Sequence, residues 1–115
     1  MDALSLLVKE KPELVLIGTP PDSHKELCLL ALNYGAHVVC EKPFMLSVAE
    51  ADEVIAAAER QCRALAVNTQ YRYMATYRHT RERLARGEFG RLYFLQCWQQ
   101  MFHPPVFEKI KWRAE

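Results

Sequence analysis

The stretch HVVCEKP at residues 37–43 indicates the fold, because it is an apolar run that stops at two charges and a proline. A short apolar run bounded in this way is typical of a buried β-strand. Pro43 cannot donate a hydrogen bond to a sheet and keeps Lys42 extended, so Glu41 and Lys42 are held at the strand's end. An ammonium in a desolvated pocket can serve as an electrostatic or acid–base group. A solvated turn is the simpler interpretation of these three residues taken alone.

Two further apolar runs, at residues 13–18 and 64–67, lie on either side of this stretch. The first does not alternate with polar residues, which predicts a strand buried on both faces of a parallel sheet. Two capping boxes, Ser23 with Glu26 and Ser47 with Glu50, predict helix starts between the runs. The apolar stripes of these helices are Leu27, Leu30, Ala31 and Tyr34, ended by Gly35, and Ala51, Val54, Ile55, Ala58 and Cys62.

The order strand, helix, strand, helix, strand with short loops predicts an α/β fold with a doubly wound, Rossmann-like parallel sheet. Residues 2–10 predict a helix before it. After the third strand we predict a helix to about Arg86, ended by Gly87 or Gly90, and an aromatic strand at residues 92–98. Four arginines lie on that helix, where a solvated face is a simpler interpretation than a phosphate site. These are Arg78, Arg81, Arg83 and Arg86.

Length and composition limit the classes of protein to which the chain can belong. Its 115 residues, half of them apolar and a quarter charged, suit one globular domain. A net charge of +1 gives no reason to expect nucleic acid or a membrane surface as a partner. The uncharged run at residues 27–40 is too short to span a bilayer, and the first residues do not resemble a signal peptide. We therefore expect a cytoplasmic protein.

The cysteines and histidines do not predict a metal site. Neither residue type shows the spacing of a zinc site, and no two cysteines form a Cys-x-x-Cys pair. We expect the cysteines to be reduced core residues, with a disulfide as the lesser alternative. The residues concerned are Cys28, Cys40, Cys62 and Cys97, and His24, His37, His79 and His103.

Each predicted strand is followed by polar sequence, and in an open parallel sheet ligands bind beyond these carboxyl ends. The first strand leads to Thr19, Pro20 and His24, the second to Lys42, and the third to the segment 68–72 with Arg72. Alone, His24 suits a helix's first turn and Arg72 a surface ion pair. Together with Lys42 they form a cationic rim for a phosphate or an alkoxide-like oxygen, which favours a functional interpretation of Lys42.

These motifs resemble the glucose–fructose oxidoreductase/inositol dehydrogenase (Gfo/Idh/MocA) family, across nearly the whole chain. The similar segments are Thr19-Pro20-x-x-x-His24, Ala31-Leu32-x-x-Gly35-x-His37-Val38-Val39-x-Glu41-Lys42-Pro43, Glu50-Ala51, Asn68-x-x-Tyr71-Arg72-Tyr73 and Gly87-x-x-Gly90. The resemblance implies the second half of an NAD(P)-binding domain at residues 1–73. It further implies a connecting helix at 74–90 and the start of a second, substrate and oligomerisation domain at 91–115.

The resemblance implies NAD or NADP as cofactor and hydride transfer at a hydroxyl-bearing carbon of a sugar, inositol or similar polyol. It places Thr19, Pro20 and His24 along the dinucleotide and Glu41 near the nicotinamide ribose. Lys42 is the implied catalytic residue, contacting nicotinamide and substrate, and Pro43 is expected to follow a cis peptide bond. Arg72 is expected to approach the nicotinamide end. The full-length parent is expected to form a homo-oligomer.

The chain also departs from the family's pattern. It contains no Gly-x-Gly-x-x-Gly loop for the pyrophosphate and no acidic residue at the end of a preceding strand for the adenosine ribose. The family's proton-transfer Asp and His are expected after Glu115, and Trp112-Arg113 resembles the approach to that region. We therefore expect an internal fragment of a dehydrogenase, inactive and binding cofactor very weakly alone, with an unpaired sheet edge that favours self-association.

Two alternatives remain open. The chain could be a non-catalytic remnant or a protein-interaction module of the same fold. A response-regulator-like domain shares the topology, but it would carry acidic clusters where this chain has Lys42 and Arg72.

Overall fold

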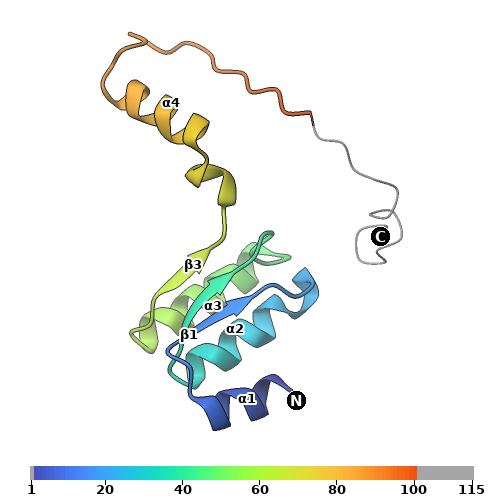
Figure 1. The fold of residues 1–115 in the computed structure, drawn as a ribbon. Helices are drawn as coiled ribbons and strands as arrows, with labels where there is room; N and C mark the ends of the chain where they lie inside the picture. Colours follow the sequence, from blue (N-terminus) through green and yellow to red (C-terminus); the bar gives the residue numbers. More distant parts are fainter. Residues whose placement is uncertain (1, 101–115) are drawn as a thin grey trace. The chain divides into compact units, whose positions relative to one another are not determined.

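The computed structural model describes residues 2–100. It divides into two compact units, Met1–Gln70 and Tyr71–Glu115, which are described separately. Figure 1 shows the order of the elements along the chain.

A three-stranded parallel sheet forms the centre of the first unit. Its strands are β1 (Leu14–Ile17), β2 (His37–Cys40) and β3 (Leu65–Val67), in the order β1-β2-β3. Parallel pairing aligns Ile17 with Cys40, and Cys40 with Val67. The three strands therefore end at the same level, and the predicted Rossmann-like sheet is confirmed.

Three helices accompany the sheet, α1 (Ala3–Glu10), α2 (His24–Asn33) and α3 (Val48–Arg60). The carboxylate of Asp2 caps α1 by accepting a hydrogen bond from Ser5 N at 2.7 Å. The predicted capping box of α3 is present, since Ser47 Oγ accepts from Glu50 N at 3.2 Å and Glu50 Oε2 accepts from Leu46 N at 3.1 Å. Gly35 follows α2 with a φ of 81°, a conformation that glycine adopts without strain.

The capping box predicted for α2 was wrong. A 3₁₀ turn, Pro21–Ser23, precedes the helix, and the Ser23 backbone is already helical there. Ser23 Oγ is instead bonded to Thr19 Oγ1 at 2.7 Å and to the Pro20 carbonyl at 2.8 Å. The proline pair before Ser23 favours this turn, which points the hydroxyl backward along the chain.

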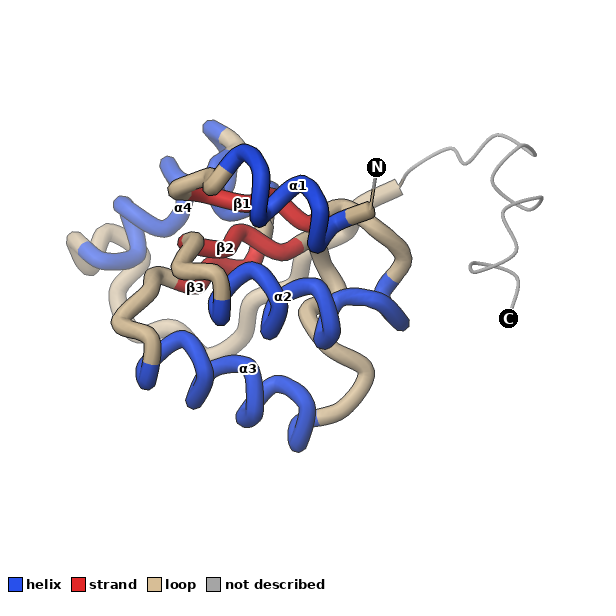
Figure 2. Tube along the Cα trace, turned by 90° about the horizontal axis from the view of Figure 1, so that it is seen from below, coloured by secondary structure: helices blue, strands red, loops and turns tan. Residues whose placement is uncertain are grey.

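The helices α2 and α3 pack beside each other against the sheet (Figure 2), and α1 packs against α2. The core between these layers is apolar. Its buried residues are Leu7, Ile17, Cys28, Ala31, Leu32, Ala36, Val38, Cys40, Val54, Ala57 and Ala58.

The prediction that residues 13–18 are buried on both faces was wrong for this unit. Strand β1 alternates: Ile17 is buried, whereas Leu14 is 57% and Leu16 69% exposed. The register places Leu16 beside Val39 and Ala66, on the sheet face opposite the buried Val38 and Cys40. The helices of this unit cover one face only, so its apolar run is half exposed.

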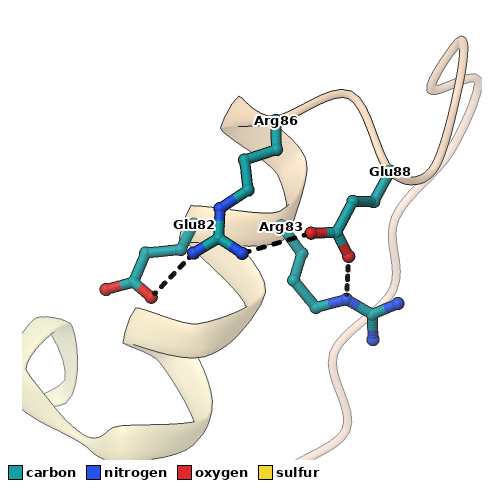
Figure 3. Close-up of polar contacts among 4 residues, drawn as sticks. All are labelled: Glu82, Arg83, Arg86 and Glu88. Carbon is teal, nitrogen blue, oxygen red and sulfur yellow. Dashed lines mark hydrogen bonds and ion pairs between the residues drawn. The ribbon is translucent and has the colours of Figure 1, made fainter.

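The second unit contains one long helix, α4 (Ala75–Ala85), which follows a 3₁₀ turn at Gln70–Tyr73. None of the helix's residues is buried, and the arginine face is solvated as predicted. Its end carries a charge cluster (Figure 3). Arg86 pairs with both Glu82 and Glu88, and Arg83 Nε lies 2.6 Å from Glu88 Oε2. Gly87, with a φ of 72°, follows the C-cap Arg86 and ends the helix, which is one of the two predicted positions, whereas Gly90, with a φ of 63°, lies in the turn after it.

The strand predicted at residues 92–98 is not formed. A strand needs a neighbour for its backbone hydrogen bonds, and residues 71–100 contain no second strand. Tyr93, Phe94 and Trp98 are largely exposed instead. Most of the predicted second-domain segment, including Trp112-Arg113 and His103, lies outside the described residues.

The cysteines only partly follow the prediction. Cys28 and Cys40 are buried, whereas Cys62 and Cys97 are exposed, and all four are free thiols. Cys62 follows α3 in a left-handed conformation with a φ of 51°, outside the core. Within residues 2–100 no group of side chains could hold a metal ion. No helix in the same range is long and apolar enough to cross a bilayer.

Candidate functional site

The carboxyl ends of the three strands bring polar residues to one edge of the sheet. Because Ile17, Cys40 and Val67 are aligned, the segments that follow them begin side by side. Thr19 follows β1, Glu41 and Lys42 follow β2, and Asn68 follows β3. This edge is where an open parallel sheet binds its ligands.

Glu41 is fixed at this edge by two hydrogen bonds. Its Oε1 accepts from the side-chain amide of Asn68, and its Oε2 accepts from the Lys42 backbone N–H at 3.2 Å. The amide of Asn68, followed by the Lys42 backbone N–H, lowers the pKa of the Glu41 carboxyl. A half-buried carboxylate, ionised and held in place, therefore stands beside Lys42.

Lys42 is exposed and precedes the cis Lys42–Pro43 peptide bond that the resemblance led us to expect. Within residues 2–100 its ammonium has no ion-pair partner. The neighbouring Glu41 carboxylate accepts hydrogen bonds from the Asn68 side-chain amide and from the Lys42 backbone N–H. An unpaired ammonium beside a fixed carboxylate can bind an oxygen that acquires negative charge.

His24 lies inside the protein rather than at its surface. The residue is fully buried, and both ring nitrogens face backbone carbonyls. Nδ1 is 3.0 Å from the Pro43 oxygen and 3.2 Å from that of Phe44, and Nε2 is 2.9 Å from the Thr19 oxygen. The ring leaves no polar atom free for a ligand.

Thr19 and Pro20 are exposed in the turn after β1. The Thr19 hydroxyl is bonded to Ser23 Oγ, and the Thr19 and Pro20 carbonyls are bonded to His24 and Ser23. The turn is therefore held by its own hydrogen bonds, and its outer surface remains open to a ligand.

Arg72 belongs to the second unit. It is exposed and lines a groove with Tyr71, Tyr77 and Arg81. The two tyrosine rings pack at a centroid distance of 6.1 Å. The groove combines aromatic surface with two guanidinium groups, which suits an anionic or planar ligand.

Two features of the site were missing from the residues first assigned to it. Asn68 was placed at this edge but given no role in the site, although the parallel register carries a signal: Cys40 pairs with Val67, so the next residues, Glu41 and Asn68, must be neighbours. The role of His24 as an internal link could not be read from sequence, because it depends on how the loop after β2 folds back over α2.

Comparison with known proteins shows what the chain is similar to. Residues 1–69 match the sequence model of the Gfo/Idh/MocA oxidoreductase family, described as having an NAD-binding Rossmann fold. The chain is 32% identical over 101 residues to a 1,5-anhydro-D-fructose reductase from Ensifer adhaerens, covering 88% of this chain and 30% of that protein. It is 37% identical over 97 residues to an inositol 2-dehydrogenase from Streptomyces avermitilis, covering 83% of this chain and 28% of that protein.

A solved structure has the same arrangement. It is the WlbA dehydrogenase from Bordetella pertussis in complex with NADH and UDP-GlcNAcA, with a TM-score of 0.73 and 26% sequence identity. The match covers 77% of this chain and 26% of that one. The chain thus spans about a third or less of the length of the proteins it matches.

Proposed function

The chain belongs to the Gfo/Idh/MocA family of NAD-binding oxidoreductases, and we propose that it forms the nicotinamide half of a cofactor site. The reaction is hydride transfer between NAD or NADP and a hydroxyl-bearing carbon of a sugar, inositol or similar polyol. The names of the similar proteins, a sugar reductase and an inositol dehydrogenase, support this substrate class. The whole enzyme comprises more than the segment that this chain matches.

One observation carries the proposal: Lys42, whose ammonium forms no ion pair within residues 2–100, follows the fixed carboxylate of Glu41 at the carboxyl edge of the sheet. A hydroxyl that is oxidised must lose a proton while its carbon loses a hydride. An ammonium at hydrogen-bonding distance stabilises the developing alkoxide, or the lysine helps to move the proton that the hydroxyl loses. We assign this catalytic role to Lys42.

The polar groups at this edge of the sheet fit a nicotinamide riboside. Glu41 keeps free lone pairs that can accept hydrogen bonds from ribose hydroxyls, and the exposed Thr19–Pro20 turn offers a surface for the dinucleotide. The cofactor, when bound, gives or takes the hydride. We assign Arg72 to the nicotinamide end, as the family resemblance implies.

We further propose the division of the chain that the family resemblance implies. Residues 1–73 form the second half of the NAD(P)-binding domain and residues 74–90 the connecting helix. Residues 91–115 begin a substrate and oligomerisation domain, and the whole enzyme is a homo-oligomer.

Reduced nicotinamide mononucleotide is the sharpest probe of this proposal, because it lacks the adenosine half whose Gly-rich loop this sequence does not contain. Titration into the ¹⁵N-labelled chain should shift the amides of Thr19, Lys42 and Asn68, with a Kd of about 1 mM. AMP, which is the adenosine half of the dinucleotide alone, is the matched control and should leave these amides unmoved.

NADH and NADPH test the same site calorimetrically. We expect both to bind the chain no more than a few times more tightly than the mononucleotide, so that no heat is detected at micromolar concentrations. Micromolar affinity would overturn this expectation. If reduced nicotinamide mononucleotide shifts no amide at the sheet edge, the assignment of a nicotinamide site fails.

The second candidate is a non-catalytic interaction module of the same fold. The exposure of Leu14 and Leu16 on strand β1 favours it, because exposed apolar side chains on an edge strand promote association. Absence of nicotinamide binding together with self-association in sedimentation experiments would support this candidate.

A further inference from the structure

His24 is the one buried polar or charged side chain among residues 2–100. It is the first residue of α2, on the segment that returns from the end of β1. A position that needed only volume could be filled by leucine without the desolvation of two ring nitrogens. The hydrogen bonds of the ring therefore explain why an imidazole stands there.

All three acceptors of His24 are main-chain carbonyls on two separate segments. Nδ1 lies 3.0 Å from the Pro43 oxygen and 3.2 Å from the Phe44 oxygen, on the loop after β2. Nε2 lies 2.9 Å from the Thr19 oxygen, in the turn after β1. The ring thus lies between the two strand ends, and because carbonyl oxygens only accept, its single N–H in the neutral form donates to one of these segments.

Lys42 is flanked by fixed neighbours. On one side Glu41 is held by Asn68, and on the other the Pro43 and Phe44 carbonyls are held by His24. The Phe44 side chain also packs against the apolar core. The ammonium of Lys42 has no partner of its own within residues 2–100, so its direction depends on the backbone to which it is attached.

We propose that His24 is a positioning residue, whose Nδ1–H holds the loop after β2 and thereby sets the direction of Lys42. This inference rests on the proposed function for the role of Lys42. It replaces the expected contact of His24 with the dinucleotide, because a fully buried ring offers no surface to a ligand.

Two amide variants separate the halves of the link. Asparagine places an amide nitrogen near the position of Nδ1, and glutamine places one near the position of Nε2. His24→Asn should therefore keep the bond to the Pro43 and Phe44 carbonyls, whereas His24→Gln should lose it and place its amide near the Thr19 carbonyl instead. Both substitutions exchange the ring for a buried amide, so each controls for the other's general effect on stability.

The first readout needs no ligand. In ¹⁵N relaxation experiments on the free chain, His24→Gln should shift the Lys42 and Phe44 amides and increase their mobility. His24→Asn should leave them close to wild type, and the Val54 and Ala58 amides of α3 should report an intact fold in both variants. If the Lys42 and Phe44 amides are unchanged in folded His24→Gln, the proposal is overturned. It is also overturned if these amides shift and become mobile to the same extent in both variants.

The second readout links the loop to binding. His24→Gln should weaken the binding of reduced nicotinamide mononucleotide about tenfold, and His24→Asn should weaken it at most about threefold. The reason is that a misdirected Lys42 ammonium loses its contact with the mononucleotide. Equal weakening by both variants would contradict the positioning role. If the wild-type chain binds no mononucleotide, the proposed function fails while the ligand-free readout still decides whether His24 holds the loop.

A third measurement uses the wild-type chain and covers the case in which a variant does not fold. Long-range ¹H–¹⁵N spectra of the imidazole show which ring nitrogen carries hydrogen. We expect a hydrogen on Nδ1 of His24, because a carbonyl oxygen can only accept. A ring that carries its hydrogen on Nε2 alone cannot hold the loop, and this result would refute the proposal.

Discussion

The side-chain amide of Asn68 donates a hydrogen bond to Glu41 Oε1, and the Asn68 backbone N–H donates to the Cys40 carbonyl at 2.8 Å. The end of β3 is thus joined to the end of β2 twice, once through a side chain. This relationship favours the ionised Glu41 carboxylate and holds it beside the Lys42 backbone N–H. Within residues 2–100 the Lys42 ammonium forms no ion pair.

Removing this amide should raise the pKa of Glu41. Asn68→Ala takes away the strongest donor that favours the ionised carboxylate, so the pKa should return toward its ordinary value of 4.5. The titration can be followed through the side-chain carboxyl ¹³C shift of Glu41. Asp2, whose pKa is lowered by its own bond with Ser5, serves as an internal control and should titrate alike in both proteins. An unmoved Glu41 curve would show that Asn68 does not set the ionisation of this carboxyl.

Substitutions at Lys42 should separate binding from stability. Lys42→Met removes an exposed, unpaired charge, so the free energy of unfolding should change by no more than about 0.5 kcal/mol. The affinity for reduced nicotinamide mononucleotide should fall, and Lys42→Arg should restore it only in part, because a guanidinium has a different shape and hydrogen-bonding geometry. Denaturant titration and NMR titration give the two quantities. Equal affinity in Lys42→Met and wild type would remove Lys42 from the site.

The core of the first unit could be predicted from sequence because its signals are local. Each strand is a short apolar run, each helix has an apolar stripe, and Gly35 and Ser47 mark ends that depend on their own neighbours. The convergence of Thr19, Lys42 and Asn68 followed from parallel topology alone. The cis peptide bond before Pro43 was expected only because of the family resemblance, and the structure contains it.

Three of the failures share a different cause, since each depended on a partner that local sequence does not specify. Residues 92–98 have strand propensity but no neighbouring strand within the second unit. Leu16 is apolar but lies on the sheet face that the helices of its unit leave uncovered. His24 binds carbonyls 19 and 20 positions away, and only the folded loop brings them to its ring.

The two serines at predicted helix starts should differ in their importance. Ser47→Ala removes a true N-cap and should lower the free energy of unfolding by about 1 kcal/mol. Ser23 makes no cap bond, so Ser23→Ala should leave the amides at the start of α2 protected to the wild-type degree. Hydrogen exchange at the first turn of each helix, alongside chemical denaturation, makes the comparison. Loss of protection at the start of α2 in Ser23→Ala would restore the capping box that the structure lacks.

Burial of the Cys28 thiol should make the protein sensitive to alkali. Burial raises the pKa of Cys28 from its ordinary value of 9.0 to about 12, chiefly because the thiolate would lie in the apolar core. Below pH 9 the thiol is protonated in folded and unfolded chains alike, and its full contribution to stability is present. Between pH 9 and 12 only the unfolded chain ionises, so the free energy of unfolding falls by up to about 1.4 kcal/mol per pH unit.

Comparison of wild type with Cys28→Ala isolates the contribution of the Cys28 thiol to the pH dependence of the free energy of unfolding. Other groups that titrate in alkali, such as Lys25, contribute alike to both proteins. Cys40 is hydrogen-bonded to Cys28, so the difference between the two proteins also includes the loss of this coupling. The difference in unfolding free energy between the two proteins should therefore shrink steadily from pH 8.5 to pH 10.5 in denaturant titrations under reducing conditions. Cys62→Ala, at an exposed position, is the matched control and should leave the alkaline slope of wild type unchanged. Parallel slopes for wild type and Cys28→Ala would mean that the buried thiol ionises as readily in the folded chain as in the unfolded one.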